Sequence, residues 1–230
     1  IDRHAENPKK KNQVALLYSA PGREEKLTFD ELRRKSNRFA NVLDKYGVKK
    51  GERVFLFMPR SPEFYISFLG ILKKAAIAGP LFEAFMEQAV EDRLEDSEAT
   101  MLITTPELLY RVPQDNLPNL KRIVLVGDTT EYQDDKYIDF YKEMEEASED
   151  FSIEWVDRED GMLIHYTSGS TGKPKGVVYS HRAIVLHSFA LGLKDTAAIS
   201  ESDVSMPVVP QFHVNAWGTP FACTWFGSTQ

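Results

Sequence analysis

The sequence has few of the features that mark secreted, membrane or nucleic-acid-binding proteins. It holds one cysteine in 230 residues, which excludes an internal disulfide and a cysteine-rich metal site. No apolar run approaches the roughly 20 residues of a membrane helix, and no basic stretch followed by an apolar core marks a signal peptide at the N-terminus. A formal net charge of −7 disfavours general nucleic-acid binding, which needs clusters of Lys and Arg. These absences indicate a cytoplasmic protein, and the apolar surroundings of Cys223 predict a buried structural thiol.

What is present is an ordinary globular composition, with 42% hydrophobic and 27% charged residues. Short apolar segments alternate with amphipathic ones, which predicts an α/β fold of largely parallel sheets flanked by helices. The predicted strands are Val14–Tyr18, Val54–Met58, Ala75–Ala78, Thr100–Thr104, Arg122–Val126, Met162–Tyr166 and Val204–Val209. The predicted helices begin at Thr28, Pro62 and Thr105 or span Glu83–Asp96, Tyr137–Glu146, Arg182–Leu193 and Val214–Phe226.

The helix starts carry recognisable signals. Thr28 and Glu31 have the spacing of a capping box, and Ser61 followed by Pro62 places a cap before a first-turn proline. The segment 128–160 is strongly acidic, with fourteen Asp or Glu against three Lys or Arg. We interpret this acidic segment as a solvated helix and loop in preference to a surface that binds a partner.

The most informative segment is a loop rich in glycine, hydroxyl groups and lysine that directly follows the strand predicted at Met162–Tyr166. Its sequence is YTSGSTGKPKG over residues 166–176, with three glycines, four Ser or Thr and two lysines. Glycine lets backbone N–H groups surround an anion, and lysine supplies compact positive charge. Since ligands bind at the carboxyl ends of strands in open α/β sheets, this loop is predicted to hold phosphate.

Two other loops with similar composition do not fit. A Walker A loop has four residues between its first glycine and its Gly-Lys-Ser/Thr ending. Here only two residues separate Gly169 from Gly172, and Pro174 follows Lys173 where Ser or Thr would be needed. A nucleophile elbow centred on Ser170 would need glycine at position 168, where the chain has serine. The first difference rejects a P-loop kinase, and the second disfavours an α/β-hydrolase.

Residues 167–176 resemble the signature loop of the adenylate-forming superfamily, which comprises acyl-CoA synthetases, luciferases and adenylation domains of peptide synthetases. A second segment, PVVPQFHVNAWG over residues 207–218, resembles the next core motif of that superfamily. The form of this motif with His213 is typical of medium- and long-chain fatty acyl-CoA synthetases. The upstream elements follow a similar order, so the resemblance covers essentially the whole chain.

The resemblance implies an AMP-forming acid–CoA ligase. A carboxylate attacks the α-phosphate of Mg-ATP to give an acyl-adenylate and pyrophosphate, and the thiol of CoA then displaces AMP. ATP, Mg²⁺ and CoA are therefore the implied cofactor and co-substrates. The resemblance gives His213 a catalytic place beside the acyl carboxylate, Thr167 a part in Mg²⁺ coordination, and Trp217 either a wall of the acyl pocket or a core position. It assigns phosphate binding to Thr167, Ser168, Gly169, Ser170, Thr171, Gly172, Lys173 and Lys175.

Two parts of the chain resemble different subfamilies. Residues up to about 175, with AGPLFEAFM at 78–86 and DRLEDSE at 92–98, resemble acetyl-CoA synthetases, whereas the chain from Val177 onward resembles fatty acyl-CoA synthetases. Either a recombinant joined at the loop or a divergent intermediate member would give this pattern. The later part favours a fatty acid over acetate as substrate.

The later motifs of the superfamily, including the small C-terminal domain with its adenylation lysine, do not occur in these residues. Residues 1–230 are therefore expected to form part of the large N-terminal domain and to be inactive alone. An enzyme that activates another carboxylic acid, such as an amino-acid-activating domain, and a non-catalytic nucleotide-binding module are the alternatives. The expected partners are small molecules, with no nucleic acid.

Overall fold

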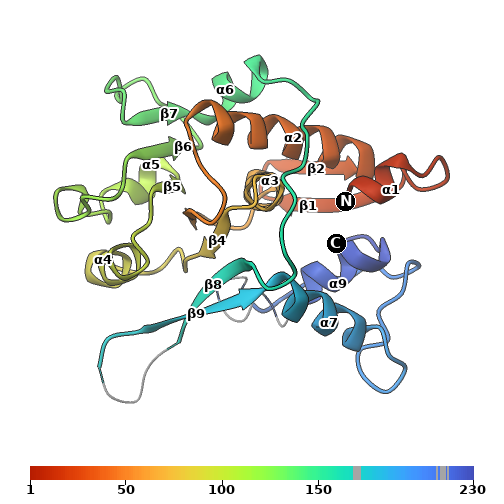
Figure 1. The fold of residues 1–230 in the computed structure, drawn as a ribbon. Coiled ribbons are helices and arrows are strands. Elements are labelled where there is room, and N and C mark those ends of the chain that lie inside the picture. The colour runs from red at the N-terminus through yellow and green to blue at the C-terminus, as the bar shows by residue number, and fades with distance from the viewer. Residues whose placement is uncertain (168–171, 211, 213–215, 217) are drawn as a thin grey trace.

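A twisted, mostly parallel sheet organises the chain in the computed structural model, which describes residues 1–167, 172–210, 212, 216 and 218–230 (Figure 1). Within those residues, the main sheet has seven strands in the order β7-β6-β5-β3-β4-β8-β9. Neighbouring strands from β7 to β8 run parallel, and β9 alone pairs antiparallel, with β8. The strands are β3 (Arg53–Phe57), β4 (Ile77–Pro80), β5 (Met101–Thr104), β6 (Arg122–Leu125), β7 (Tyr137–Asp139), β8 (Gly161–Thr167) and β9 (Lys175–Ser180).

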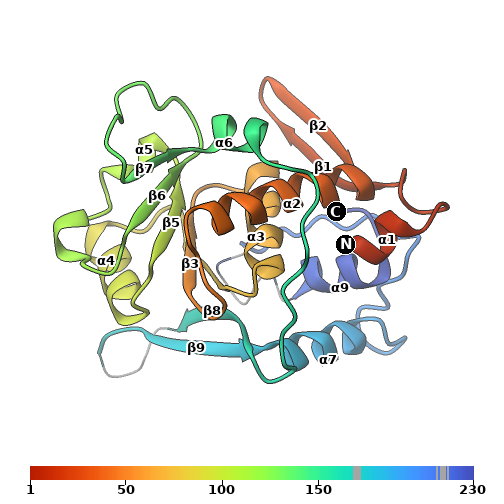
Figure 2. The same ribbon diagram turned by 45° about the horizontal axis from the view of Figure 1, so that its top comes forward.

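Helices cover both faces of this sheet, as the predicted α/β fold requires (Figure 2). Successive side chains of a strand point to opposite faces, so Val54 and Leu56 of β3 pack with α2, α3 and α6, whereas Phe55 and Phe57 pack with α4 and α5. These four side chains of β3 are fully buried. The helices are α1 (Asp2–Glu6), α2 (Phe29–Lys45), α3 (Pro62–Lys73), α4 (Glu87–Asp96), α5 (Pro106–Leu109), α6 (Phe140–Glu146), α7 (His181–Leu191) and α9 (Thr219–Phe226), with a 3₁₀ turn at Gln114–Asn116.

The helix starts predicted from capping signals are confirmed. The Thr28 hydroxyl accepts a hydrogen bond from the Glu31 N–H at 3.2 Å, and the Glu31 carboxylate accepts one from the Thr28 N–H at 2.8 Å. Ser61 caps α3 by accepting from the Phe64 N–H at 3.3 Å, with Pro62 in the first turn. These signals operate within three residues of the chain, which is why the sequence reveals them.

Other predicted elements need correction. Tyr137–Asp139 is strand β7, and α6 begins only at Phe140, where Asp139 caps it by accepting from the Lys142 N–H at 3.0 Å. Val204–Val209 is no strand, because only Val204 forms a bridge, to Thr229. Helix α4 begins at Glu87, four residues later than expected.

Two strands have no counterpart among the predicted elements. Strand β9 returns beside β8 directly after the glycine-rich loop, so the sheet ends in an antiparallel hairpin. The polar segment of β2 (Arg23–Thr28) pairs with β1 (Val14–Ala20) in a separate two-stranded hairpin. Both strands lack the buried alternation from which a strand is recognised, since β9 is largely exposed and β2 is rich in Arg, Glu and Lys.

The acidic segment contains helix α6 and loops in which most of the acidic residues are exposed, which agrees with the interpretation as a solvated helix and loop, but some of its carboxylates also pair with basic side chains of the protein itself. The buried Glu143 carboxylate contacts Lys45 at 2.6 Å, and Glu149 contacts Arg38 at 3.1 Å, both on α2. Farther along, Glu154 pairs with Lys74 at 3.0 Å. These ion pairs hold the segment across the helical layer on its way from α6 to β8 (Figure 1).

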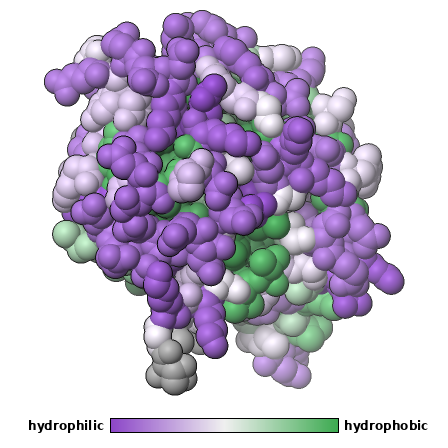
Figure 3. Space-filling model, turned by 60° about the vertical axis from the view of Figure 1, so that its left-hand side comes forward, coloured by the Kyte–Doolittle hydropathy of each residue, from purple (hydrophilic) through white to green (hydrophobic). Residues whose placement is uncertain are grey.

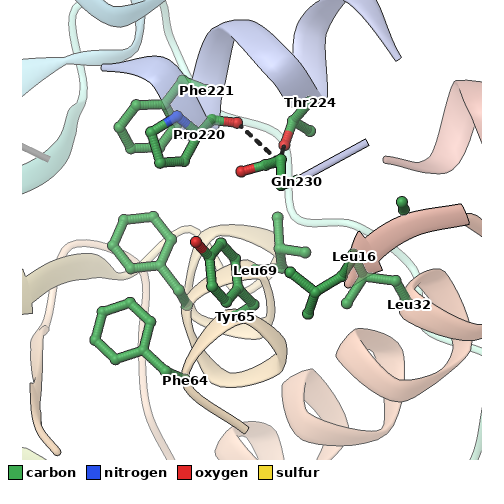
Figure 4. A pocket seen from close by; sticks show the side chains of 11 residues that line it. Leu16, Leu32, Phe64, Tyr65, Leu69, Pro220, Phe221, Thr224 and Gln230 are labelled. Carbon is green, nitrogen blue, oxygen red and sulfur yellow. Dashed lines mark hydrogen bonds between the residues drawn. The ribbon is translucent and has the colours of Figure 1, made fainter. Parts of the chain in front are cut away.

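The end of the chain packs against its beginning. The backbone of Gln230 pairs with β1, donating to Ala15 O at 3.0 Å and accepting from the Leu17 N–H at 2.6 Å. Helix α9 lies over α3 and β1 and leaves an apolar cavity of about 40 Å³ that includes Phe64, Leu69 and Phe221 in its lining (Figure 4). Cys223 is buried here, as predicted. No helix in the described ranges is long and apolar enough to span a membrane.

Candidate nucleotide site

The glycine-rich loop leaves the carboxyl end of a strand that runs parallel to its neighbour. Strand β8 pairs in parallel with β4 through Ala78 and Leu163, and it ends at Thr167. The prediction that this loop begins at a strand's carboxyl end is therefore confirmed. Ser168, Gly169, Ser170 and Thr171 lie outside the described residues, so the geometry of the site comes from the positions on either side of them.

Both ends of the loop meet across the first pair of the β8–β9 hairpin. Thr167 and Lys175 are Cα partners in the antiparallel register, so the two predicted site residues lie directly opposite each other. Both are exposed, and Gly172 has φ +132°, with no atom of the described residues within 4 Å of the position that a Cβ would take. That backbone conformation favours glycine, and the open space leaves room for an anion close to the main chain.

Lys173, the other lysine of the loop, has a partner that the sequence did not predict. Lys173 Nζ lies 3.3 Å from Asp92 Oδ1 on α4, and the lysine side chain is 75% exposed whereas that of Asp92 is 14% exposed. The hydrogen bond and charge of Asp92, together with the charges of Glu95 and Glu91, raise the pKa of Lys173. Lys173 therefore remains a cation over the whole physiological range.

Helix α4 also holds the stem of the loop. The Tyr166 hydroxyl donates to Asp96 Oδ2 at 2.7 Å, and burial together with that carboxylate raises the pKa of Tyr166. The Arg93 guanidinium lies 4.2 Å from the ring centre of Phe85 and 5.7 Å from that of Tyr166. An acidic helix upstream of a lysine-bearing loop was the signal available in the sequence, but the two segments are about 70 residues apart.

The second motif reaches the same edge of the sheet. Phe212 stacks on Phe82 with ring centres 4.2 Å apart and meets Phe85 edge-on at 5.9 Å. Arg60, which follows β3, donates to the carbonyl of Pro207 at 2.6 Å. Phe85 contacts Phe212 on one side and Arg93 on the other, so a continuous set of contacts joins the second motif to the loop stem. His213 and Trp217 lie outside the described residues.

A largely apolar pocket of about 280 Å³ lies between the β8–β9 hairpin, α7 and the end of the second motif. Gly218 closes one side of it, with φ +74°, and a Cβ at this position would lie 2.4 Å from the ring of His187. The sequence pattern did not single out these residues, because they come from three separate segments. The lining consists of Leu163, His165, Tyr179, Ala183, Ile184, His187, Gly218 and Phe221.

Thr167 is the only residue for which a metal-binding role was predicted. Among the residues that the structure describes, no group of three or more His, Cys, Asp or Glu side chains could hold a metal ion. A cation at this loop would thus need most of its ligands from phosphate and water, which is the usual manner of Mg²⁺.

Comparison with known proteins agrees with this geometry. The family described as AMP-binding enzyme matches residues 1–230. An acetyl-coenzyme A synthetase of Bacillus subtilis is 55% identical over 186 residues, which are 80% of this chain and 32% of that protein. A 3-methylmercaptopropionyl-CoA ligase of Ruegeria lacuscaerulensis is 36% identical over 211 residues, covering 86% of this chain and 38% of that protein.

Solved structures give the same result. The anthranilate CoA ligase AuaEII, crystallised with anthranoyl-AMP, has a TM-score of 0.86 at 29% identity and matches 96% of this chain and 42% of that one. The inhibitor-bound N-terminal domain of FACL13 from Mycobacterium tuberculosis has a TM-score of 0.81 at 26% identity, over 99% of this chain and 54% of that one. The chain spans about a third of the length of the curated relatives named above. Because the family match covers every residue, the chain belongs to the AMP-binding enzyme family.

Proposed function

We propose that this chain is part of the large N-terminal domain of an AMP-forming acid–CoA ligase and that its loop binds the phosphates of ATP. The observation that supports this most directly is the pairing of Thr167 with Lys175 at the carboxyl end of β8, with both residues exposed. An anion at the hairpin would meet the Lys175 ammonium group and the open backbone at Gly172. Lys173 can join them once it leaves Asp92.

In the proposed reaction a carboxylate oxygen attacks the α-phosphorus of ATP, and the bond to the β-phosphate breaks to release pyrophosphate. The sulfur of CoA then attacks the acyl carbonyl of the adenylate, and AMP leaves with the bonding electron pair while the thiol loses its proton. The charge on the departing pyrophosphate is the main electrostatic demand of the first step. Lys175 is suited to that demand, because the β8–β9 pairing fixes its backbone opposite Thr167.

The residues present fit Mg²⁺ delivered with ATP better than a resident metal. The Thr167 hydroxyl offers one oxygen ligand, and phosphate oxygens and water would supply the others. When bound, the ion neutralises phosphate charge and orients the tail. Thr167 would hold it at the carboxyl end of β8, opposite Lys175.

We further propose that the pocket beside α7 receives the acyl chain of the acid. Its lining is largely apolar, with Leu163, Ile184 and Phe221, and it adjoins the end of the second motif at Gly218. An apolar wall gains free energy by burying an apolar chain, which supports a fatty or similarly apolar acid over acetate. We propose that His213, in the same motif, lies beside the acyl carboxylate.

Calorimetric titration of the chain with Mg-ATP tests the phosphate role. Lys175→Ala is expected to weaken binding by about tenfold or more, since a charge-assisted hydrogen bond contributes roughly 1.5–3 kcal/mol. Lys194→Ala is the matched control, because Lys194 is also an exposed lysine but follows α7, away from the hairpin. It is expected to change the affinity less than twofold.

Equal affinity for Mg-ATP in Lys175→Ala and in the unchanged chain would contradict the assignment. The absence of any nucleotide binding would favour a folding module without ligand. Pyrophosphate exchange by the longer protein with a panel of acids then separates fatty acids from acetate and amino acids. Exchange with amino acids alone would favour an adenylating enzyme of the alternative class.

A further inference from the structure

One face of α4 is acidic and lies against the glycine-rich loop. Asp92, Glu95 and Asp96 are three and four residues apart, so they share a face of the helix. In both Figure 1 and Figure 2 this helix lies beside the end of the β8–β9 hairpin that carries the loop. Hydrophilic side chains cover most of the side of the molecule that comes forward in Figure 3. Carboxylates therefore border a loop that is proposed to bind phosphate, although the two groups carry charge of the same sign.

The Asp92 side chain is held in place on α4, whereas the Lys173 side chain is free enough to exchange Asp92 for another anion. The Asp92 side chain is only 14% exposed and also accepts a hydrogen bond from Gln88 Nε2 at 3.1 Å, one turn earlier on α4. Lys173, by contrast, is 75% exposed and reaches Asp92 with its flexible end. Since exposed ion pairs are weak, this contact is strong enough to set the position of the lysine but not to keep it from a more highly charged anion.

The stem of the loop is held separately from Lys173. Tyr166 donates to Asp96 at 2.7 Å, and Arg93 lies between the rings of Phe85 and Tyr166. Gly176 leaves room for this packing, because a Cβ there would lie 2.9 Å from Ile164 Cδ1 and 3.1 Å from the Tyr166 ring. Loss of the Lys173–Asp92 contact therefore leaves the base of the hairpin anchored on α4.

We propose that Asp92 is a positioning residue that holds Lys173 against α4 until the phosphate tail of ATP takes the lysine, while Asp96 and Tyr166 keep the stem in place. This inference rests on the proposed function of the loop. Lys173 Nζ must leave Asp92 to contact a phosphate, so the carboxylate and the ligand compete for one ammonium group. The competition lowers the affinity for phosphate and lets the lysine return to α4 when pyrophosphate departs.

Glu95, three residues after Asp92 on α4, makes a sharp comparison possible. Glu95 also acts on Lys173 through its charge, but its carboxylate forms no ion pair with the Lys173 ammonium group within 4 Å, whereas that of Asp92 does. Asp92→Asn and Glu95→Gln remove the same charge from the same helix face. Asp92→Asn is expected to tighten the binding of inorganic pyrophosphate about two- to fivefold, as the loss of an exposed ion pair implies, and Glu95→Gln is expected to change it less.

A zero-length carbodiimide cross-link between Lys173 and Asp92 reports their contact directly. The folded chain is cross-linked and then digested, and the cross-linked peptide is quantified by mass spectrometry. Pyrophosphate is expected to suppress this cross-link as the site fills. The Lys45–Glu143 pair, whose atoms are 2.6 Å apart on the opposite helical layer, is the internal control and should stay constant. Asp92→Asn should abolish the first cross-link and leave the second.

The outcomes separate the inference from the function beneath it. Pyrophosphate binding without a fall in the Lys173–Asp92 cross-link, or with an equal fall in the control pair, overturns the inference alone. So does a gain in affinity in Glu95→Gln equal to that in Asp92→Asn. If no variant binds pyrophosphate while the cross-link forms, the proposed function and the inference fail together. Tighter binding confined to Asp92→Asn, with selective loss of the cross-link, supports both.

Discussion

Replacement of Gly218 by alanine should destabilise the protein through two separable effects. The backbone at Gly218 has φ +74°, and an added Cβ would lie 2.4 Å from Cδ2 and 2.5 Å from Nε2 of His187. The left-handed conformation costs an alanine about 1–2 kcal/mol, and overpacking against the His187 ring costs about 1–3 kcal/mol. Gly218→Ala is therefore expected to lower the free energy of unfolding by about 2–5 kcal/mol, measured by urea denaturation.

Two further variants resolve that loss into its parts. Gly22→Ala has a similar φ of +79° with no atom within 4 Å of the new Cβ, so it should show the conformational cost alone, about 1–2 kcal/mol. His187→Ala removes the ring that the new Cβ would meet. Its effect on the free energy of unfolding should therefore be about 1–3 kcal/mol more favourable in the Gly218→Ala background than in the unchanged chain. A double-mutant cycle with no coupling between positions 187 and 218 would refute the reasoning, as would equal losses in Gly22→Ala and Gly218→Ala.

Two other predictions concern stability. Thr28→Ala removes the capping box of α2 and should lower the free energy of unfolding by about 1 kcal/mol, measured by urea denaturation. Thr105→Ala is the control and should lower it little, because Thr105 makes no side-chain capping bond at α5. Equal losses in the two variants would contradict the capping argument. Burial lowers the pKa of His181 from its ordinary 6.5, with Asp160 opposing the shift and Lys50 adding to it. Only the unfolded chain then takes up this proton as the pH falls through about 6.5, so the contribution to stability is complete above that pH and is lost below it. His181→Gln should therefore lessen the fall in the free energy of unfolding between about pH 7 and pH 5.5, and an unchanged pH profile would show that His181 does not contribute.

Features that depend on a few neighbouring residues were predictable from the sequence. The capping box at Thr28 and the cap at Ser61 act within one helical turn, and the buried strands around Phe55 appear as continuous apolar runs. The loop that indicated the family was equally clear, because glycine, hydroxyl and lysine side chains are concentrated between residues 166 and 176. The family match over the whole chain confirms the family that this loop indicated.

Features that depend on distant pairing were missed or placed wrongly. The ion pairs of the acidic segment were not predicted, because partners such as Lys45, which contacts Glu143, lie about 100 residues earlier in the chain. Strand β9 was missed because its exposed side chains give no alternating pattern in the sequence. It is a strand because its backbone pairs with β8. In each case the deciding free energy comes from contacts that exist only after the chain has folded.

Residue types and spacings within short windows were sufficient for the α/β class and for the family. The folded chain was needed to show that Thr167 faces Lys175, that Asp92 holds Lys173, and that Phe212 reaches Phe85. The strand order brings β8 next to β4, and α4 then lies beside the loop although some 70 residues separate Asp96 from Tyr166. Side chains that far apart meet through the register of the sheet and the packing of its helices, which no local pattern encodes.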